Sequence, residues 1–134
     1  MCGKSVPRCE CSCDIFNNKV SSLEDIMVSE KPKSKLGIAH TRWATHGEPS
    51  EANAHPHKSK DSVYIVHNGI IENYVELRDS LTKDGYDFTS QTDSELIAHL
   101  LDYYLSQNNN MIDAMYLAKA KLEGAYAIAA IDIK

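Results

Sequence analysis

The second residue of the chain is a cysteine, and this position gives it a chemistry that an internal cysteine lacks. If Met1 is removed, Cys2 becomes the amino terminus and carries a free α-amino group beside its thiol. The thiol is a strong nucleophile, and an α-amine with an ordinary pKa of about 7.7–8.0 can act as its base. Taken alone, Met-Cys-Gly is better explained by a second-position cysteine without a role.

A second group of reactive side chains lies in residues 40–47, which read HTRWATHG. Arg42 stands among hydroxyl and imidazole groups, and a guanidinium can hold an α-carboxylate through two parallel hydrogen bonds. Taken one at a time, these residues have plainer interpretations, with Trp43 in the core and Arg42 in a surface ion pair. Those interpretations fit the whole string poorly, so the sequence predicts a carboxylate-binding segment here.

A third group, His67-Asn68-Gly69, directly follows an apolar run. The Asn68 amide and the Gly69 N–H can point into one small space, which is the arrangement that stabilises the oxyanion of a tetrahedral intermediate. The alternative is a plain Asn-Gly turn, which is a common dipeptide in hairpins. Together the three groups offer a nucleophile, a carboxylate-binding segment and a candidate oxyanion hole.

Strands and helices must hold these residues, and hydrophobic periodicity predicts where they lie. Strands are expected over residues 36–43, 62–67, 86–89 and 125–133, helices over 21–27, 72–83, 92–104 and 111–122, and a polar loop over 45–60. Thr92 and Glu95 have the spacing of a capping box, in which each side chain bonds the other residue's backbone N–H. The strand over 62–67 is expected to end in a turn at Asn68-Gly69. Helices packed on a mixed or antiparallel sheet make an α+β domain.

The charge and hydropathy of the 134 residues exclude several classes of protein. A net charge of −5 gives no basic field for nucleic acid, whose binding rests on clustered Lys and Arg. No apolar run is long enough to span a membrane, and Lys4, Arg8 and Glu10 interrupt the stretch that a signal peptide needs. We therefore expect a cytoplasmic protein without nucleic-acid or membrane partners, whose thiols stay reduced.

Cys9, Cys11 and Cys13 alternate with other residues near the amino terminus. Cysteines two residues apart rarely meet the geometry of a disulfide, so a disulfide is not expected. A zinc site would need a second pair of ligands at wider spacing, and His55 and His57 are the candidates for that pair. A metal- or thiol-binding module built on these cysteines is one alternative function.

Three stretches together resemble class II glutamine amidotransferases: residues 40–47, residues 48–57 and residues 66–73, which read VHNGIIEN. Within that superfamily the chain is most similar to the glutamine–fructose-6-phosphate aminotransferase family, because related amidotransferases carry a different Arg-containing string. The similarity runs from about residue 20 to residue 133. It implies a glutaminase domain that forms part of an N-terminal-nucleophile (Ntn) hydrolase-like αββα sandwich with antiparallel sheets.

The resemblance also assigns roles to individual residues. The catalytic roles fall to Cys2, Asn68 and Gly69, and the substrate-binding roles to Arg42, Trp43, Thr45, His46 and Asp93. Cys2 would attack the glutamine amide with its α-amine carrying the proton, and Asn68 with Gly69 would form the oxyanion hole. Arg42 and the segment after it would hold the substrate carboxylate, and Asp93 would bind the substrate ammonium group. Without the resemblance, Asp93 is interpreted as an ordinary helix cap.

The family pattern is interrupted in residues 4–18, which do not match it and are too short and polar to form the strand that normally follows the cysteine. A truncated domain is also expected, since the strand over 125–133 runs into the last residue. Residues 1–134 are therefore interpreted as one incomplete type-2 glutamine amidotransferase domain, with glutamine as substrate and with no cofactor or metal. Its partners would be sugar-phosphate isomerase domains that this chain lacks, and full-length family members could form homodimers.

Three functions follow from these observations. The first is an enzyme domain that hydrolyses glutamine to glutamate and ammonia, as part of glucosamine-6-phosphate synthesis from fructose 6-phosphate. The second is a non-catalytic fragment that keeps the pocket residues without a working site. The third is the metal- or thiol-binding module on Cys9, Cys11 and Cys13. Labelling of Cys2 by a glutamine analogue separates the first function from the other two.

Overall fold

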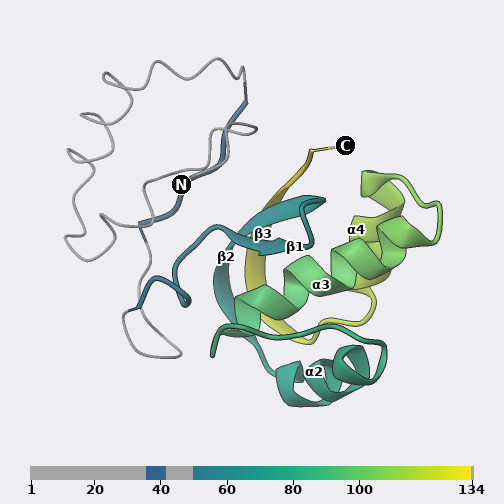
Figure 1. The fold of residues 1–134 in the computed structure, drawn as a ribbon, viewed down its shortest axis with the longest axis horizontal. Helices are drawn as coiled ribbons and strands as arrows, with labels where there is room; N and C mark the ends of the chain where they lie inside the picture. The colour runs from purple at the N-terminus through teal and green to yellow at the C-terminus, as the bar shows by residue number, and fades with distance from the viewer. Residues whose placement is uncertain (1–35, 42–49, 134) are drawn as a thin grey trace.

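The computed structural model describes residues 36–41 and 50–133 of the chain (Figure 1). Its elements are β1 (His57–Ser59), β2 (Val63–Ile71), α2 (Tyr74–Lys83), α3 (Asp93–Ser106), α4 (Met111–Lys119) and β3 (Gly124–Asp132). The strands form one antiparallel sheet in the order β1-β2-β3. Helices α3 and α4 pack against each other, and α3 lies along β1 and β2 (Figure 1).

The sheet has two different faces because successive side chains of a strand point to opposite sides. Val63, Ile65 and His67 of β2 are buried against the helices, and we call their side the helix face. The other side, which we call the open face, carries Val66, Asn68 and Ile70 of β2 opposite Ala129, Ala127 and Ala125 of β3. Ile70 is 46% exposed, and no described helix covers this face.

The core lies between the helix face and α3. Ile65 and Ile71 of β2 and Leu96, Ile97 and Leu101 of α3 are almost completely buried. Burying each of these large apolar side chains stabilises the fold by about 1.5–3 kcal/mol. Helix α4 presents mainly its two buried alanines to this core, and their small side chains let it pack close to α3.

The amino end of α3 is held by side chains, as the sequence predicts in part. Thr92 is the N-cap and accepts a hydrogen bond from the Glu95 backbone N–H at 3.4 Å, so the predicted start of this helix is confirmed. The second half of the predicted capping box is wrong. Glu95 does not reach back to Thr92 but accepts from the backbone N–H groups of Thr89 and Ser90, at 2.9 and 2.7 Å. The carboxylate thereby fixes the loop before α3.

Two predictions about strands are wrong. Residues 86–89 form no strand, because the loop that they belong to is held by side chains instead: Tyr86 Oη donates to Asp102 and the Thr89 N–H to Glu95. Residues 36–41 are not a strand either, and residues 42–43 of that prediction lie outside the described part. The predicted helix over 21–27 also lies outside it.

The predicted turn at Asn68-Gly69 is wrong as well. Strand β2 continues through both residues to Ile71, with Asn68 paired with Ala127 and Gly69 with Tyr126. Within the range 45–60, predicted as a polar loop, the structure has the three-residue strand β1, which pairs with the first residues of β2. A short polar strand has no hydrophobic period, so only its pairing partner reveals it.

Within the described residues, no helix has the length and apolar character needed to cross a membrane.

Candidate functional site

Asn68 projects from the middle of β2 onto the open face and is exposed. Its cross-strand neighbour is Ala127, and the neighbouring pairs place Ala129 and Ala125 on the same face. These small side chains leave space above the sheet around the carboxamide. His40, from the described segment before β1, reaches this space and forms a hydrogen bond to Asn68 Oδ1 at 2.6 Å.

Gly69 follows Asn68 in a conformation that other residues rarely adopt, with φ at +124°. A Cβ atom at this position would lie 2.2 Å from the carbonyl oxygen of Ala125 on β3. The residue must therefore be glycine for β2 and β3 to stay this close. The backbone next to the Asn68 carboxamide is consequently fixed, which is what a preorganised oxyanion hole requires.

Asp93 is the first residue of α3 and is 3% exposed. Thr92 is the N-cap, so the interpretation of Asp93 as an ordinary cap is wrong. Its Oδ2 accepts a hydrogen bond from the Ile71 backbone N–H at 2.9 Å, which ties the start of α3 to the end of β2. The other oxygen, Oδ1, lies 3.9 Å from His67 Nδ1 and 3.5 Å from Ser94 Oγ.

His55, His57 and His67 are buried near the amino end of α3, and the ring of His40 lies beside that of His55. On the helix face, His67 Nδ1 lies 2.8 Å from Ser94 Oγ. His57 Nε2 lies 2.9 Å from Thr92 Oγ1. The ring of His55 lies between those of His40 and His57, and the centroid distances are 4.4 Å to His40 and 4.9 Å to His57. From the sequence, His55 and His57 were candidates for metal ligands. The structure instead places them in a column of rings that ends at His40.

Glu95 is the most strongly perturbed acid in the described residues. Burial alone would raise the pKa of its carboxyl. The His99 imidazole, 3.7 Å away and beyond hydrogen-bonding distance, and the hydrogen bonds from Thr89 and Ser90 outweigh this effect and hold the pKa well below its ordinary value. The buried carboxylate is charged and fully used by its donors, so its role is structural.

A third buried carboxylate, Asp102, lies near the other end of α3. It accepts hydrogen bonds from Ser62 Oγ and from Tyr86 Oη, and Lys60 Nζ lies 3.1 Å from its Oδ2. Burial raises the pKa of the Asp102 carboxyl, but these three donors lower it more, and its net pKa lies below the ordinary value. Burial and the contact with Asp102 raise the pKa of the Tyr86 hydroxyl.

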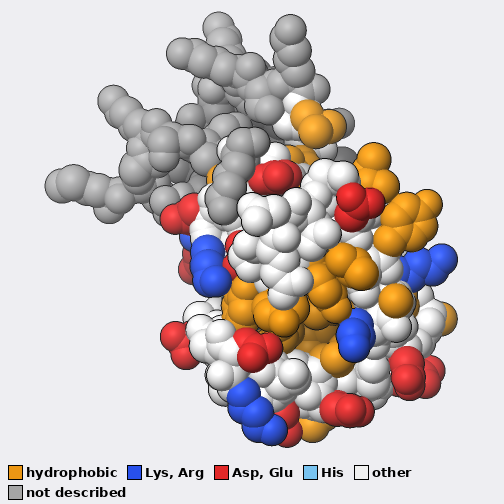
Figure 2. Space-filling view, turned by 90° about the vertical axis from the view of Figure 1, so that its right-hand side faces the viewer, with side chains coloured by type: hydrophobic (Ala, Val, Ile, Leu, Met, Phe, Trp, Pro, Cys, Tyr) orange, Lys and Arg blue, Asp and Glu red, His pale blue; other side chains and the backbone are white. Residues whose placement is uncertain are grey.

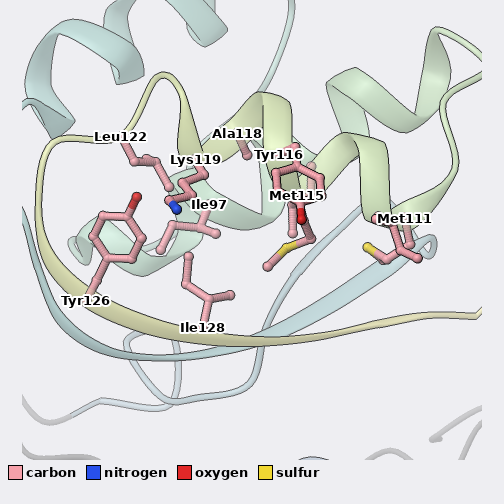
Figure 3. A pocket seen from close by; sticks show the side chains of 11 residues that line it. Ile97, Met111, Met115, Tyr116, Ala118, Lys119, Leu122, Tyr126 and Ile128 are labelled. Atoms are coloured by element: carbon pink, nitrogen blue, oxygen red, sulfur yellow. The ribbon is translucent and has the colours of Figure 1, made fainter.

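A cavity with a volume of about 320 Å³ lies among α3, α4 and β3 (Figure 3). Its lining is apolar apart from Lys119 and the Tyr116 and Tyr126 hydroxyls, and it includes Met111 and Met115 of α4. Figure 2 shows hydrophobic side chains gathered in a hollow on the side of the molecule that faces right in Figure 1. The β3 residues that line the cavity, Tyr126 and Ile128, lie on the helix face, away from Asn68.

The remaining predicted site residues, Cys2, Arg42, Trp43, Thr45 and His46, lie outside the described residues. The same is true of Cys9, Cys11 and Cys13, on which the predicted metal- or thiol-binding module rests. In the part of the chain that the structure describes, no group of three or more His, Cys, Asp or Glu side chains is arranged to hold a metal ion. The geometry therefore bears on Asn68, Gly69 and Asp93 alone.

A family model described as a glutamine amidotransferase domain matches residues 40–134. The glutamine–fructose-6-phosphate aminotransferase (isomerizing) of Acinetobacter baylyi is 53% identical over 113 residues, which cover 84% of this chain and 18% of the relative. The enzyme of the same name from Legionella pneumophila (strain Paris) is 50% identical over 119 residues, covering 89% of this chain and 20% of the relative. The chain thus spans about a fifth of the length of these relatives.

Solved structures are also similar to this chain in fold. The glutamine phosphoribosylpyrophosphate amidotransferase of B. subtilis matches with a TM-score of 0.56 and 27% identity, over 69% of this chain and 20% of that chain. A structure described as the allosteric regulatory enzyme of purine biosynthesis matches with a TM-score of 0.58 and 30% identity, over the same shares. With the antiparallel sheet and its helices, these matches confirm the predicted α+β class as part of an Ntn-type fold.

Proposed function

Because this chain belongs to the glutamine amidotransferase domain family, in the type found in glutamine–fructose-6-phosphate aminotransferases, we propose that it hydrolyses glutamine to glutamate and ammonia. The proposed nucleophile is Cys2, which becomes the amino terminus when Met1 is removed. The proposed domain comprises residues 1–134, with residues 4–18 departing from the family pattern.

The observation that carries this proposal is the position of the Asn68 carboxamide. It is a polar group on a face of alanines and aliphatic side chains, and it is exposed. Its neighbours on β3 are Ala125, Ala127 and Ala129, whose methyl groups need no hydrogen-bonding partner, so the pairing of β2 with β3 does not account for an amide there. A reaction that forms an oxyanion does need one. Gly69, fixed against β3, supplies the adjoining backbone for a second donor.

The proposed reaction has two steps. The Cys2 thiolate attacks the side-chain carbonyl carbon of glutamine, and the resulting oxyanion accepts hydrogen bonds from the Asn68 NH2 group and the Gly69 N–H. The C–N bond then breaks, and the α-amine of Cys2 gives the leaving nitrogen the proton that it took from the thiol, so ammonia departs and a thioester remains. In the second step, water attacks the thioester carbon, the C–S bond breaks, and glutamate leaves with the Cys2 thiol restored.

Substrate recognition is proposed to use the two charges on the glutamine α-carbon. Arg42, with Trp43, Thr45 and His46 beside it, is assigned to the carboxylate, which a guanidinium can bind in a bidentate manner. Asp93 is assigned to the ammonium group. Since the Ile71 N–H already occupies Asp93 Oδ2, the ammonium would bind through Oδ1.

In a full-length family member, the ammonia is proposed to serve the synthesis of glucosamine 6-phosphate from fructose 6-phosphate on sugar-phosphate isomerase domains, within a homodimer. The chain described here spans about a fifth of such relatives. The proposed location is the cytoplasm, where a free Cys2 thiol stays reduced.

The decisive experiment is mass spectrometry of the intact chain after treatment with a glutamine analogue that carries a diazoketone electrophile. We expect a species without Met1 that gains one analogue, with the adduct on the Cys2 peptide. The untreated chain should release glutamate from glutamine, and this activity should disappear in Cys2→Ser. An excess of glutamine should slow the labelling, which shows that the analogue enters the substrate site.

A chain that retains Met1, stays unmodified and releases no glutamate would overturn the proposal and favour a non-catalytic fragment. Labelling that spreads over Cys9, Cys11 and Cys13 and is not slowed by glutamine would show thiol reactivity without a site. Stoichiometric zinc in elemental analysis, lost when these three cysteines are replaced, would favour the metal-binding module instead.

A further inference from the structure

A hydrogen bond joins His40, at the start of the HTRWATHG segment, to Asn68 on β2. The Nε2 atom of His40 lies 2.6 Å from Asn68 Oδ1, although the residues are 28 positions apart in the chain. Within the described residues, this is the hydrogen bond that holds the Asn68 side chain. It therefore decides which end of the carboxamide faces the space above the open face.

The two ends of a carboxamide have nearly the same shape and opposite chemistry, because the oxygen accepts hydrogen bonds and the NH2 group donates them. Only the NH2 end can stabilise an oxyanion. When His40 Nε2 carries a proton, it donates to Asn68 Oδ1 and leaves the NH2 group for the substrate. If the proton of neutral His40 were on Nδ1, Nε2 would accept from the NH2 group, and the Asn68 oxygen would face the reaction.

The strand opposite Asn68 cannot supply this orientation. Its cross-strand partner Ala127 and the flanking Ala125 and Ala129 end in methyl groups, which form no hydrogen bonds of this kind. Rotation of the carboxamide is therefore unopposed from β3. Among the residues that the structure describes, the contact with His40 is the source of preference between the two orientations.

His40 is itself held in place by its neighbours. Its ring lies 4.4 Å from that of His55 with an interplanar angle of 42°, and the ring of His57 meets His55 edge-on at 4.9 Å. At the end of this column His57 Nε2 lies 2.9 Å from the hydroxyl of Thr92, the N-cap of α3. The position of His40 is thereby connected to a buried helix terminus.

We propose that His40 is a positioning residue, which fixes the Asn68 carboxamide with its NH2 group directed at the oxyanion. The inference rests on the proposed glutaminase function. His40 does not touch the reacting atoms and acts through Asn68.

The kinetic test compares two substitutions of His40 in the full chain. His40→Phe keeps a ring but removes the donor, and we expect the turnover rate on glutamine to fall about tenfold or more while KM changes less than about twofold. His40→Gln keeps an N–H donor of similar reach, and we expect its rate to return to within about threefold of the wild-type rate. A residue that merely supports the fold would show no such rescue.

A double substitution separates positioning from an independent effect. If His40 acts through Asn68, then His40→Phe should cost nothing further in the Asn68→Ala background, since coupled residues are not additive. Two losses that multiply would overturn the proposal.

A second readout does not depend on activity. In the chain labelled with 15N at histidine, we expect a His40 Nε2–H signal that exchanges slowly with water and is lost on Asn68→Ala. His99, which lies 2.8 Å from Ser59 Oγ through its Nδ1, should give an unchanged signal and serves as the internal control. A neutral His40 that carries its proton on Nδ1, or an Nε2–H signal indifferent to Asn68→Ala, would overturn the proposal. A chain without glutaminase activity that shows the expected signals would overturn the proposed function and support the positioning contact.

Discussion

The two faces of the β2–β3 sheet use polar residues in opposite ways. On the helix face, Asp93, Glu95 and Asp102 of α3 are buried, and each accepts several hydrogen bonds or ties one element to another. On the open face, Asn68 is exposed among alanines and is held within the described residues by His40.

The difference teaches which polar residues the fold requires. A buried carboxylate must be paired because its desolvation would otherwise cost several kcal/mol, so the residues on the helix face are explained by folding. An exposed amide can bond water instead, so the fold does not require a protein partner for it and its NH2 group can serve a reaction. Stability and the proposed reaction should therefore respond to different substitutions, with Gly69 as the position that serves both.

The largest effect on stability is expected from Gly69→Ala. Its Cβ would lie 2.2 Å from the Ala125 carbonyl oxygen at a φ of +124°, so β2 and β3 would have to separate. We expect the free energy of unfolding in urea to fall by about 4 kcal/mol, from overpacking and backbone strain together. Gly85→Ala is the matched control, because its φ is +87° and its Cβ would meet nothing within 4 Å. Equal losses in the two variants would refute the close approach at Gly69.

The next effect should leave stability alone. Asn68→Ala is expected to lower the turnover rate on glutamine by about a hundred- to a thousandfold, as loss of one oxyanion-hole donor does. Its free energy of unfolding should change by less than about 0.5 kcal/mol, since the side chain is exposed. Tyr64→Phe, on the same face of β2, is the control for both measurements. If Asn68→Ala unfolded the chain instead, the separation of the two faces would not hold.

The sequence predicts the elements that carry strong periods and misses those that depend on distant partners. Helix α3 is found from its cap and its apolar face, and β2 from its run of Val, Tyr and Ile. The continuation of β2 through Asn68-Gly69 was not predictable, because it depends on β3 more than 50 residues later in the chain, where Tyr126 pairs with Gly69. The pairing with β3 outweighs the local preference of Asn-Gly for a turn.

The candidate site divides in the same way. The motif identifies Asn68, Gly69 and Asp93 as residues with a role to test, and the structure gives their surroundings. The sequence does not give the bond from Asp93 to the Ile71 N–H or the contact of His40 with Asn68, since both join segments more than 20 residues apart. The signal for His40 was its place in the same string as Arg42, which indicates proximity to the site without its partner.

A smaller loss is expected when the helix face loses a buried charge. In Glu95→Gln, one acceptor oxygen becomes a donor that faces the Thr89 and Ser90 N–H groups. We expect the free energy of unfolding near neutral pH to fall by about 2–3 kcal/mol, from the lost charged hydrogen bonds. Glutaminase kinetics of the folded fraction should be preserved. The exposed Glu123→Gln is the control and should change stability by less than about 0.5 kcal/mol.

The pH dependence of that loss has a definite sign. Because the folded pKa of Glu95 is lowered, its stabilisation is fully present above the ordinary carboxyl pKa and is lost as the pH falls through the folded value. The difference between wild type and Glu95→Gln should therefore be largest above about pH 5 and shrink below about pH 4. A difference that stays constant down to about pH 3 would show that the charge of Glu95 is not what stabilises the loop.

The smallest effect on the free energy of unfolding is expected from two lysine ion pairs, one with a buried carboxylate and one with an exposed carboxylate. Lys60 bonds the buried Asp102 at 3.1 Å and lies 4.2 Å above the Tyr86 ring, whereas Lys58 bonds the exposed Asp61 at 2.8 Å. We expect Lys60→Met to lower the free energy of unfolding by about 1 kcal/mol, and Lys58→Met by about 0–0.5 kcal/mol. Added salt should reduce the smaller effect more, because exposed charges are screened more strongly. Since the Lys58 pair is the shorter one, equal losses would mean that distance and not burial sets the strength of these pairs. In that case the buried carboxylates of the helix face would differ from surface charges in position but not in what they contribute.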